Sequence, residues 1–517
     1  MIHNIKRERF ESALHKMKLP TVCKMSLTAL LLLLCILSTQ AQNKREFRGA
    51  WIQCVNGQYL GKSTQQIQAM LTSQLDELQK DGVNAIIFQV RAECDALYES
   101  KLEPWSKFLT GVQGQAPSPY WDPLAWMIQE CHKRGMELHA WINPYRAKHG
   151  STSMQQVAST NIVKKRPDLC FSYDNLVLLN PGLQAAADYT CQIAADIVSR
   201  YDIDGFHIDD YFYPYPVAGK QIPDQELYRS NPRGLRNIGD WRRDNVSRFV
   251  KQLGETIHEL KPWVKFGVSP FSIYRNKRND PNGSETFGLQ NYDDLYADVL
   301  LWVNNGWIDY CVPQLYWEIG NRAANYDTLI KWWNKNAGNR PLYIGEDIER
   351  TAKYPDPTNP KSHQLPAKHI LHQKMSNVKG TVLWYAKTAA DNVGNIGHTL
   401  RDYYWRYPAL QPSMPFLDNK APKPVKKLKM RWTEDGPILT WKAPKAKKWG
   451  DIVNKYAIYR FEKHEKIDIN DVTKLQKITY DDFIKLPYDK SKNYIYIVTG
   501  LDRVGNESKI QKIKVKM

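Results

Sequence analysis

Short apolar runs and amphipathic segments alternate eight times between residues 45 and 407 of this 517-residue chain. Helical patterns such as residues 64–80 and 241–260 separate runs of strand length. Eight such alternations in one span predict an α/β fold with a closed parallel (β/α)8 (TIM) barrel. A doubly wound open sheet is the alternative, but no Gly-rich phosphate loop follows the first strand. The expected strands are residues 47–53, 84–90, 137–143, the start of 202–214, 264–269, 309–316, 341–345 and 380–385.

A Pro-rich connector at residues 409–424 ends this rhythm and closes the predicted barrel domain, residues 42–408. Beyond it, residues 425–517 show short alternating strands separated by turn-rich segments. This pattern predicts a C-terminal β-sandwich of the fibronectin type III-like kind.

Residues 1–41 have the features of a secretory signal peptide. A basic stretch ending at Lys24 precedes an apolar run at residues 27–37, and small residues lead up to Ala41. The apolar run is too short to predict a membrane span. We therefore expect cleavage near Ala41 and a secreted or periplasmic protein with no stable membrane span in its mature form.

The formal net charge of +18 is unevenly distributed. Residues 418–517 hold 24 Lys and Arg against 13 Asp and Glu, whereas residues 42–417 hold 42 against 39. A basic C-terminal domain suits contact with the cell wall or another anionic surface, and a solvated Lys-rich face explains it equally well. Export disfavours nucleic acid as a partner. The Cys and His residues show no metal-site spacing, so we expect neither metal nor cofactor.

The segment 202–214 carries the strongest chemical signal, because it leads from an apolar strand directly into Asp209, Asp210 and an aromatic loop. Buried carboxylates are costly unless they are paired or used, and the carboxyl ends of barrel strands are where active sites assemble. Side chains alternate along a strand, so His207 and Asp209 share one phase. On the third strand Trp141, Asn143 and Tyr145 share one phase, and both sets are expected to face the same rim. Asp209 is therefore the better candidate to face the barrel mouth.

Carboxylate, amide, guanidinium and aromatic groups at the strand ends favour a carbohydrate substrate, since sugars stack on aromatic faces and need many hydrogen-bond partners. Arg91 could merely neutralise Asp209 or Asp95, a role as well supported as sugar binding. Trp384 has a position that is more often core than sugar platform. The predicted substrate-binding residues are Arg91, Asp95, Asn143, Tyr145, His207, Gln314, Tyr316, Trp317 and Trp384.

Hydrolysis of an acetal requires two carboxyl groups, one to protonate the leaving oxygen and one to act as nucleophile or to activate water. Asp209 is the first candidate. Its partner is open among Asp210, Glu318, Asp95 and Glu346, of which Glu346 is out of phase with Gly345 on its own strand. The catalytic set that we predict is Asp209, Asp210 and Glu318.

Six short motifs at these strand ends resemble those of a known family in sequence and order. They are residues 48–51, 89–91 with 95–98, 143–146, 204–214, 267–271 and 313–317. Across residues 44–408 the chain resembles the bacterial glycosyl-hydrolase-like family 10, which includes DigH-type enzymes that cut peptidoglycan glycan strands lacking stem peptides. The resemblance implies a (β/α)8 barrel, export to the envelope and glycosidase activity, with Asp209 and Asp210 on the acidic doublet.

The function that we expect is therefore a secreted glycoside hydrolase acting on a bacterial polysaccharide, foremost peptidoglycan glycan. A carbohydrate-binding barrel without turnover is one alternative. A glycosidase of a dietary or host glycan is the other.

Overall fold

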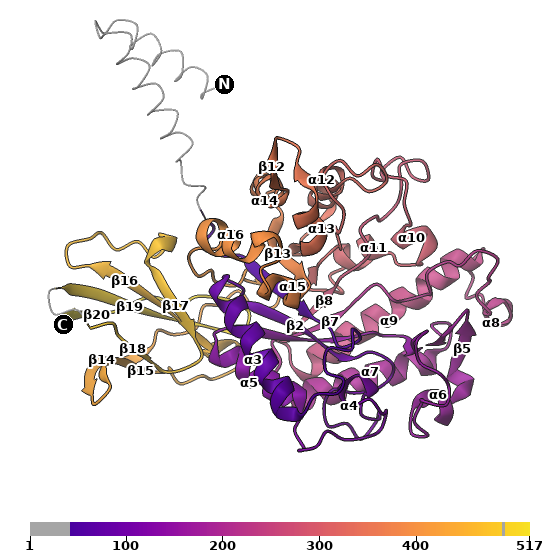
Figure 1. Ribbon diagram of the computed structural model, residues 1–517, viewed down its shortest axis with the longest axis horizontal. Coiled ribbons are helices and arrows are strands. Elements are labelled where there is room, and N and C mark those ends of the chain that lie inside the picture. Colours follow the sequence, from indigo (N-terminus) through magenta and orange to yellow (C-terminus); the bar gives the residue numbers. More distant parts are fainter. Residues whose placement is uncertain (1–41, 489–491, 517) are drawn as a thin grey trace, which may run out of the picture. The chain divides into compact units, whose positions relative to one another are not determined.

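The computed structural model describes residues 42–488 and 492–516, and the predicted signal peptide lies outside them. Eight parallel strands close into a barrel in the order β1-β2-β3-β7-β8-β9-β10-β13. Strands β2, β7, β8 and β13 are labelled in Figure 1. The (β/α)8 prediction is confirmed. The strands are β1 (Phe47–Ile52), β2 (Ala85–Arg91), β3 (Glu137–Ile142), β7 (Gly205–Ile208), β8 (Lys265–Val268), β9 (Tyr310–Cys311), β10 (Leu342–Asp347) and β13 (Val378–Trp384).

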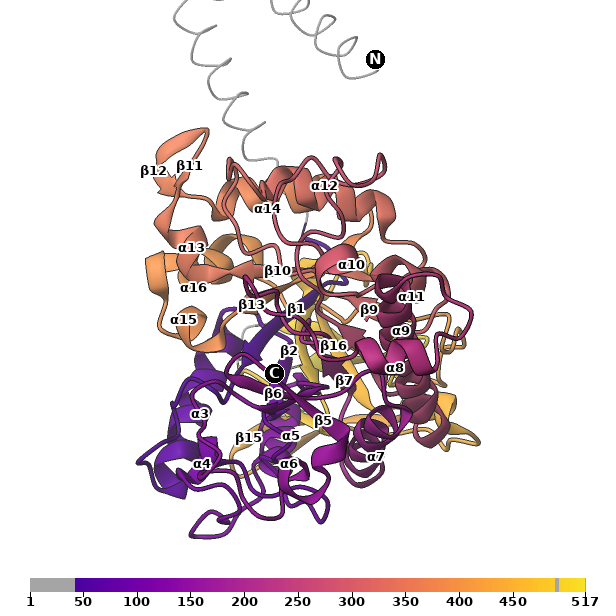
Figure 2. The ribbon, with the colours of Figure 1, turned by 90° about the vertical axis from the view of Figure 1, so that its right-hand side faces the viewer.

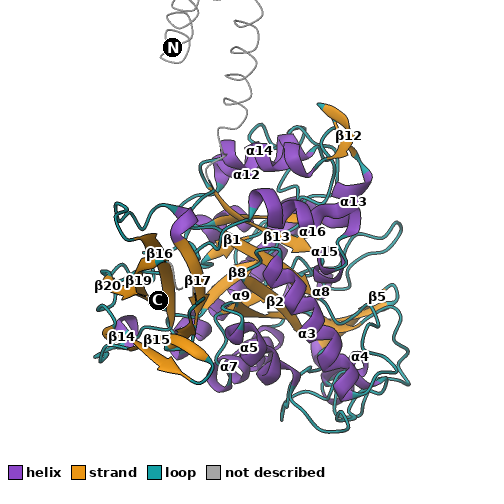
Figure 3. Ribbon diagram, turned by 60° about the vertical axis from the view of Figure 1, so that its left-hand side comes forward, coloured by secondary structure: helices purple, strands orange, loops and turns teal. Residues whose placement is uncertain are grey.

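Helices cover the outside of the barrel, as the purple ribbons of Figure 3 show. The longer ones are α3 (Thr64–Lys80), α5 (Pro123–Lys133), α7 (Gln184–Arg200), α9 (Ile238–Leu260), α12 (Tyr326–Asn336) and α14 (Leu365–Lys374). Shorter ones are α4 (Lys107–Thr110), α6 (Ile162–Lys165), α8 (Gln225–Ser230), α10 (Asn291–Asp294), α11 (Val299–Asn304), α13 (Ile348–Lys353), α15 (Ala386–Ala390) and α16 (Ile396–Thr399).

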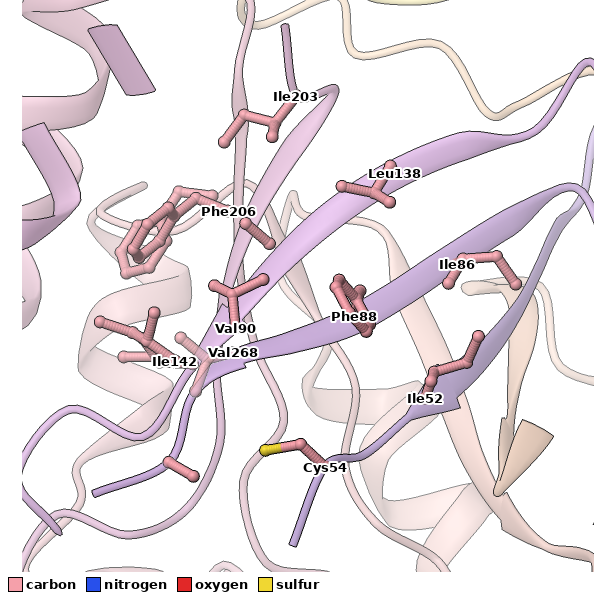
Figure 4. Close-up of a cluster of buried hydrophobic side chains, with 14 of the residues drawn as sticks. Ile52, Cys54, Ile86, Phe88, Val90, Leu138, Ile142, Ile203, Phe206 and Val268 are labelled. Atoms are coloured by element: carbon pink, nitrogen blue, oxygen red, sulfur yellow. The ribbon is translucent and has the colours of Figure 1, made fainter. Parts of the chain in front are cut away.

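Two apolar layers follow from the alternation of side chains along the strands. Ile86 and Phe88 of β2 point outward into the layer between strands and helices, which Figure 4 shows in close-up. Ala85 and Ile87 of the same strand point into the barrel lumen. Helix α3 covers its part of the outer layer with a buried stripe at helical spacing, and Ser63 caps its amino terminus.

Long loops leave the carboxyl ends of several strands. After β3 the chain forms a small antiparallel sheet in the order β4-β6-β5, from β4 (Arg146–Lys148), β5 (Cys170–Tyr173) and β6 (Leu176–Leu179), seen with α6 in Figure 2. A two-stranded hairpin, β11 (Pro355–Asp356) and β12 (Asn359–His363), precedes α14. These insertions build the rim of the barrel mouth.

The C-terminal region consists of two antiparallel sheets. The first has the order β14-β15-β18, and the second has the order β17-β16-β19-β20. The strands are β14 (Lys426–Thr433), β15 (Gly436–Lys442), β16 (Lys455–Glu462), β17 (Leu475–Thr479), β18 (Phe483–Lys485), β19 (Asn493–Leu501) and β20 (Gln511–Lys516).

The C-terminal region closes the barrel at the end opposite to the mouth. Met414 and Val504 belong to the apolar cluster of the barrel lumen. Lys455 of β16 lies 2.6 Å from the carboxylate of Glu137, the first residue of β3, and Lys265 of β8 binds the same carboxylate at 2.6 Å. All three charged side chains are buried, so the contact joins the two domains without intervening solvent.

Candidate active site

Asp209 lies directly after β7 and is buried by contacts from the neighbouring strand β3. The indole nitrogen of Trp141 donates to its Oδ2 at 3.0 Å, and the amide of Asn143 donates to the same oxygen. The register explains the arrangement, since Trp141 pairs with His207 and both strands end together at the rim. The structure therefore brings Asp209, Trp141 and Asn143 together, as their shared phase predicts.

Asp210 is buried beside Asp209 and accepts a hydrogen bond from the hydroxyl of Tyr215. Tyr215 belongs to the aromatic loop that follows the doublet. Burial raises the pKa of Asp210. Burial, and then the charge of Asp210, raise the pKa of Asp209 to about 7, against the opposing effects of the Arg146 charge and the Trp141 hydrogen bond. One carboxyl of this pair can therefore carry a proton near neutral pH, as a general acid must.

The amide of Asn143 is held in one orientation by two donors. Gln89 donates to its Oδ1 at 2.7 Å, and Arg146 donates to the same oxygen. Because the amide oxygen is occupied in this way, the amide nitrogen is directed at Asp209. Arg146 also faces the loop after β7, with its guanidinium 4.8 Å from the ring centre of Tyr211.

Arg91 supports this network from behind. It forms a buried ion pair with Glu103, with nitrogen–oxygen distances of 2.8 Å, and donates to the backbone oxygen of Asn143 at 2.6 Å. Its partner is thus Glu103, neither Asp209 nor Asp95. Glu103 lies twelve residues further along a loop, where no periodic pattern indicates the pairing.

Three other residues of the predicted site lie below or beside the mouth. Asp95 caps its own loop, accepting from the backbone of Glu93 at 3.0 Å and from Gln113 at 3.2 Å. His207 is buried in the barrel and bonded to Ser269 and Tyr310, and burial holds the pKa of its ring well below the usual value. Tyr145 is fully buried, with its ring 5.0 Å from that of Phe249 in the outer layer.

Trp51, Trp141, Tyr316 and Trp384 form an aromatic floor at the mouth. The ring of Trp384, which is partly exposed, stacks on Tyr316 at 6.0 Å and meets Trp51 and Trp141 edge-on at 6.1 and 6.3 Å. Trp141 is also the donor to Asp209, so the floor is in contact with the doublet. Gln314, beside the floor, donates to the backbone oxygen of Ser269 at 2.9 Å. Trp317 packs edge-on against Phe271 at 5.5 Å.

The two remaining acidic candidates, Glu318 and Glu346, are both engaged by other side chains. Glu318 accepts from Asn321 at 2.7 Å and lies 3.4 Å from Arg350. Burial alone would raise the pKa of Glu318, but these two partners lower it overall. Glu346 points away from the lumen and pairs with the buried Lys368 and with Tyr326.

Asp347 is a residue that the sequence analysis missed. It ends β10, two residues after Gly345 in the phase that faces the lumen, and its backbone pairs with Trp384. Its charge contributes, after burial and Asp210, to raising the pKa of the Tyr316 hydroxyl. The alternation that placed Glu346 out of phase would have found Asp347 one residue later.

A hollow of about 260 Å³ opens beside the doublet. Its lining includes Tyr211 and Tyr215 from the loop after β7, Tyr173 and Leu176 from the β5–β6 hairpin, and Arg146 and His149. Among residues 42–488 and 492–516, no group of three His, Cys, Asp or Glu side chains is placed to hold a metal ion. In the same part of the chain, no helix combines the length and apolarity that crossing a membrane requires.

A closed parallel barrel with a buried acidic pair and an aromatic floor at its carboxyl-terminal rim defines a glycoside hydrolase of the barrel class. The family described as "Glycosyl hydrolase-like 10" matches residues 46–361. The chain belongs to this family, which confirms the predicted resemblance.

Two relatives carry the same kind of name. Glycosyl hydrolase YngK of Bacillus subtilis (strain 168) is 40% identical over 92% of this chain and 94% of its own. Glycosyl hydrolase DigH of Escherichia coli (strain K12) is 40% identical over 57% of this chain and 71% of its own. Among solved structures, the glycoside hydrolase domain of PgaB (BpsB) from Bordetella bronchiseptica aligns with a TM-score of 0.45 at 11% identity, covering 70% of this chain and 99% of that domain.

Proposed function

We propose that this protein is a secreted or periplasmic glycoside hydrolase that cleaves the glycan strands of peptidoglycan. The observation that carries the proposal is the buried pair of Asp209 and Asp210 beside the aromatic floor, with the pKa of Asp209 raised to about 7. Similarity to DigH and YngK along the barrel supports the same class of reaction.

In the reaction that we propose, the protonated carboxyl of Asp209 donates its proton to the glycosidic oxygen as the bond to the anomeric carbon breaks. A second carboxylate attacks that carbon or activates the water that does so. Asp210 is buried beside Asp209, and Asp347 ends β10 in the phase that faces the lumen, so we place this role on one of them rather than on Glu318, which is engaged by Asn321 and Arg350. Oδ1 of Asp347 accepts the backbone N–H of Arg350 at 2.8 Å, and this bond at the amino end of α13 holds its carboxylate in place.

The other side chains divide into two groups in this proposal. Trp384, Tyr316, Trp317 and Gln314 lie at the mouth and contact the sugar. Asn143 orients the carboxyl of Asp209, and Arg91 holds the backbone of Asn143 in place. Three predicted residues support the site without contacting the sugar. Asp95 stabilises its own loop, His207 is hydrogen-bonded inside the lumen, and Tyr145 packs in the outer layer.

Export and wall contact are further parts of the proposal. Residues 1–41 are removed as a signal peptide, and the three-plus-four strand arrangement supports a fibronectin type III-like C-terminal domain. On the outer face of the β14-β15-β18 sheet, Lys429, Arg431 and Lys442 are exposed without a carboxylate partner among the described residues. This basic face suits an anionic wall surface.

A substrate panel tests the proposal. The purified protein is incubated with denuded peptidoglycan glycan, intact sacculi, chitin and host glycans, and new reducing ends are measured. We expect release from denuded glycan. Cleavage of a host glycan alone would move the substrate to that class, and binding of denuded glycan without any cleavage would identify a carbohydrate-binding barrel.

A further inference from the structure

Four partly exposed aromatic rings form a row along the barrel mouth, apart from the floor. We call Tyr211, Tyr215, Phe271 and Trp317 the rim row. Successive ring centres lie 5.6, 6.2 and 5.5 Å apart. The first two rings follow β7, the third follows β8 and the fourth follows β9, and these strands are neighbours in the barrel. The row therefore runs along the rim across three consecutive strand ends.

The row continues beyond Tyr211. There the Arg146 guanidinium covers the ring of Tyr211, and the hollow of about 260 Å³ opens between the row and the β5–β6 hairpin. Tyr173 and Leu176 add an aromatic and an aliphatic wall on that side. Surface for apolar contact is thus available along the whole line from the hairpin to Trp317.

The acidic doublet lies beside an inner member of this line. Tyr215 donates its hydroxyl hydrogen to Asp210, and Asp209 is the next residue along the chain. Tyr211 and the hollow lie on one side of this contact, and Phe271 and Trp317 lie on the other. A polymer that follows the row would present one of its internal bonds to the carboxyl groups.

We infer that a sugar polymer binds along the rim row on both sides of Tyr215 and is cut at internal bonds rather than at its ends. The inference rests on the hydrolase function proposed above. Each sugar that stacks on a further ring adds binding energy, so affinity grows with chain length until the row is filled. Each cleavage consumes one water, which gives a hydroxyl to the anomeric carbon of one fragment and a hydrogen to the departing oxygen of the other.

Binding of oligomers by the Asp209→Asn variant tests the row without requiring turnover. Denuded glycan oligomers of two to eight sugars serve as the probe. We expect at least a ten-fold gain in affinity from two sugars to six, and we expect Trp317→Ala to weaken the binding of the longest oligomer roughly ten-fold. Tyr403→Ala is the control, since that ring is 76% exposed and belongs to the helical segment after α16. Equal affinity at all lengths, or no binding, would overturn the inference.

Product lengths from the wild-type protein supply the second test. At low conversion of long denuded strands, internal cleavage gives fragments of many lengths. If reducing ends appear but the first products are only mono- and disaccharides, the inference fails while the hydrolase function stands. If length-dependent binding occurs and no reducing ends appear, the hydrolase proposal fails and the rim row remains a binding surface.

Discussion

Replacement of Glu137 by Gln should destabilise the whole chain far more than its position at the start of one strand suggests. Its carboxylate binds Lys265 of the barrel and Lys455 of the C-terminal domain, each at 2.6 Å. The relative exposure of these side chains does not exceed 5%, so water cannot solvate the ammonium groups once the carboxylate is lost. The isosteric amide leaves the two buried ammonium groups without the carboxylate that contacts both of them.

The size of the effect follows from two bounds. Removal of one partner from a buried ion pair costs about 3–5 kcal/mol. A lysine with a reference pKa of about 10.4 can instead lose its proton at pH 7 for about 4–5 kcal/mol. We therefore expect Glu137→Gln to lower the free energy of unfolding by roughly 3–5 kcal/mol, a large part of the total for an ordinary domain.

Denaturant-induced unfolding, followed by tryptophan fluorescence, measures this loss. The control is Glu434→Gln, at an exposed turn of the C-terminal domain, for which we expect a change within about 0.5 kcal/mol. Adding Lys455→Met to Glu137→Gln should recover part of the stability, because one uncompensated charge is then removed. A loss below about 1 kcal/mol for Glu137→Gln, or no recovery in the double variant, would refute the reasoning.

The wild-type advantage over Glu137→Gln should also depend on pH. Burial opposes ionisation of Glu137, but the charges of Lys265 and Lys455 outweigh it and hold its pKa well below the usual value. A carboxyl with a lowered folded-state pKa contributes stability above its unfolded pKa and loses it as the pH falls. The advantage should therefore be complete at neutral pH and shrink below about pH 4.

Three further predictions concern the mouth. If Asp209 is the general acid, kcat/KM falls above pH 7. Asp210→Asn should move this fall to lower pH, because the neighbouring charge then no longer raises the pKa of Asp209. An unmoved pH profile would contradict the assignment of Asp209 as the acid. Asp209→Asn should stabilise the fold at pH 8 by up to about 4 kcal/mol, because the buried wild-type carboxyl ionises less readily in the folded state than in the unfolded state. Denaturation curves should show this gain developing between pH 4 and 7. Asp347→Asn should lower kcat at least 100-fold while Glu318→Gln changes it less than about three-fold, and the reverse order would assign the second carboxylate to Glu318.

The barrel was predictable because each of its strands corresponds to a local apolar run in the sequence. The helices between the strands have apolar residues at helical spacing. The run at residues 309–316 was expected to be one strand, yet only Tyr310–Cys311 pairs regularly in β9. Pro313 lacks a backbone N–H and interrupts the ladder, which resumes as single bridges at Gln314. The contact between Glu137 and Lys455 joins residues 318 positions apart, and no local pattern indicates it.

At the site, alternation was informative along each strand and for the first residue after it. It predicted that Asp209, Trp141 and Asn143 share one side, and they contact one another. Tyr145 was placed by the same rule, but it lies three residues beyond the end of β3 at Ile142, so the phase no longer applies and its ring lies in the outer layer. Partners contributed by loops, such as Glu103 for Arg91, depend on the folded loop and could not be predicted.

The measurement that tests the central claim most directly compares binding and cleavage in one sample. Wild-type protein and the Asp209→Asn variant are mixed with denuded peptidoglycan glycan, and bound glycan and new reducing ends are both measured. We predict that the wild-type protein releases reducing ends, and that the variant binds equally well but releases at least 1,000-fold fewer per unit time. Cleavage by the variant at the wild-type rate would contradict the assignment of Asp209 as the group that protonates the glycosidic oxygen.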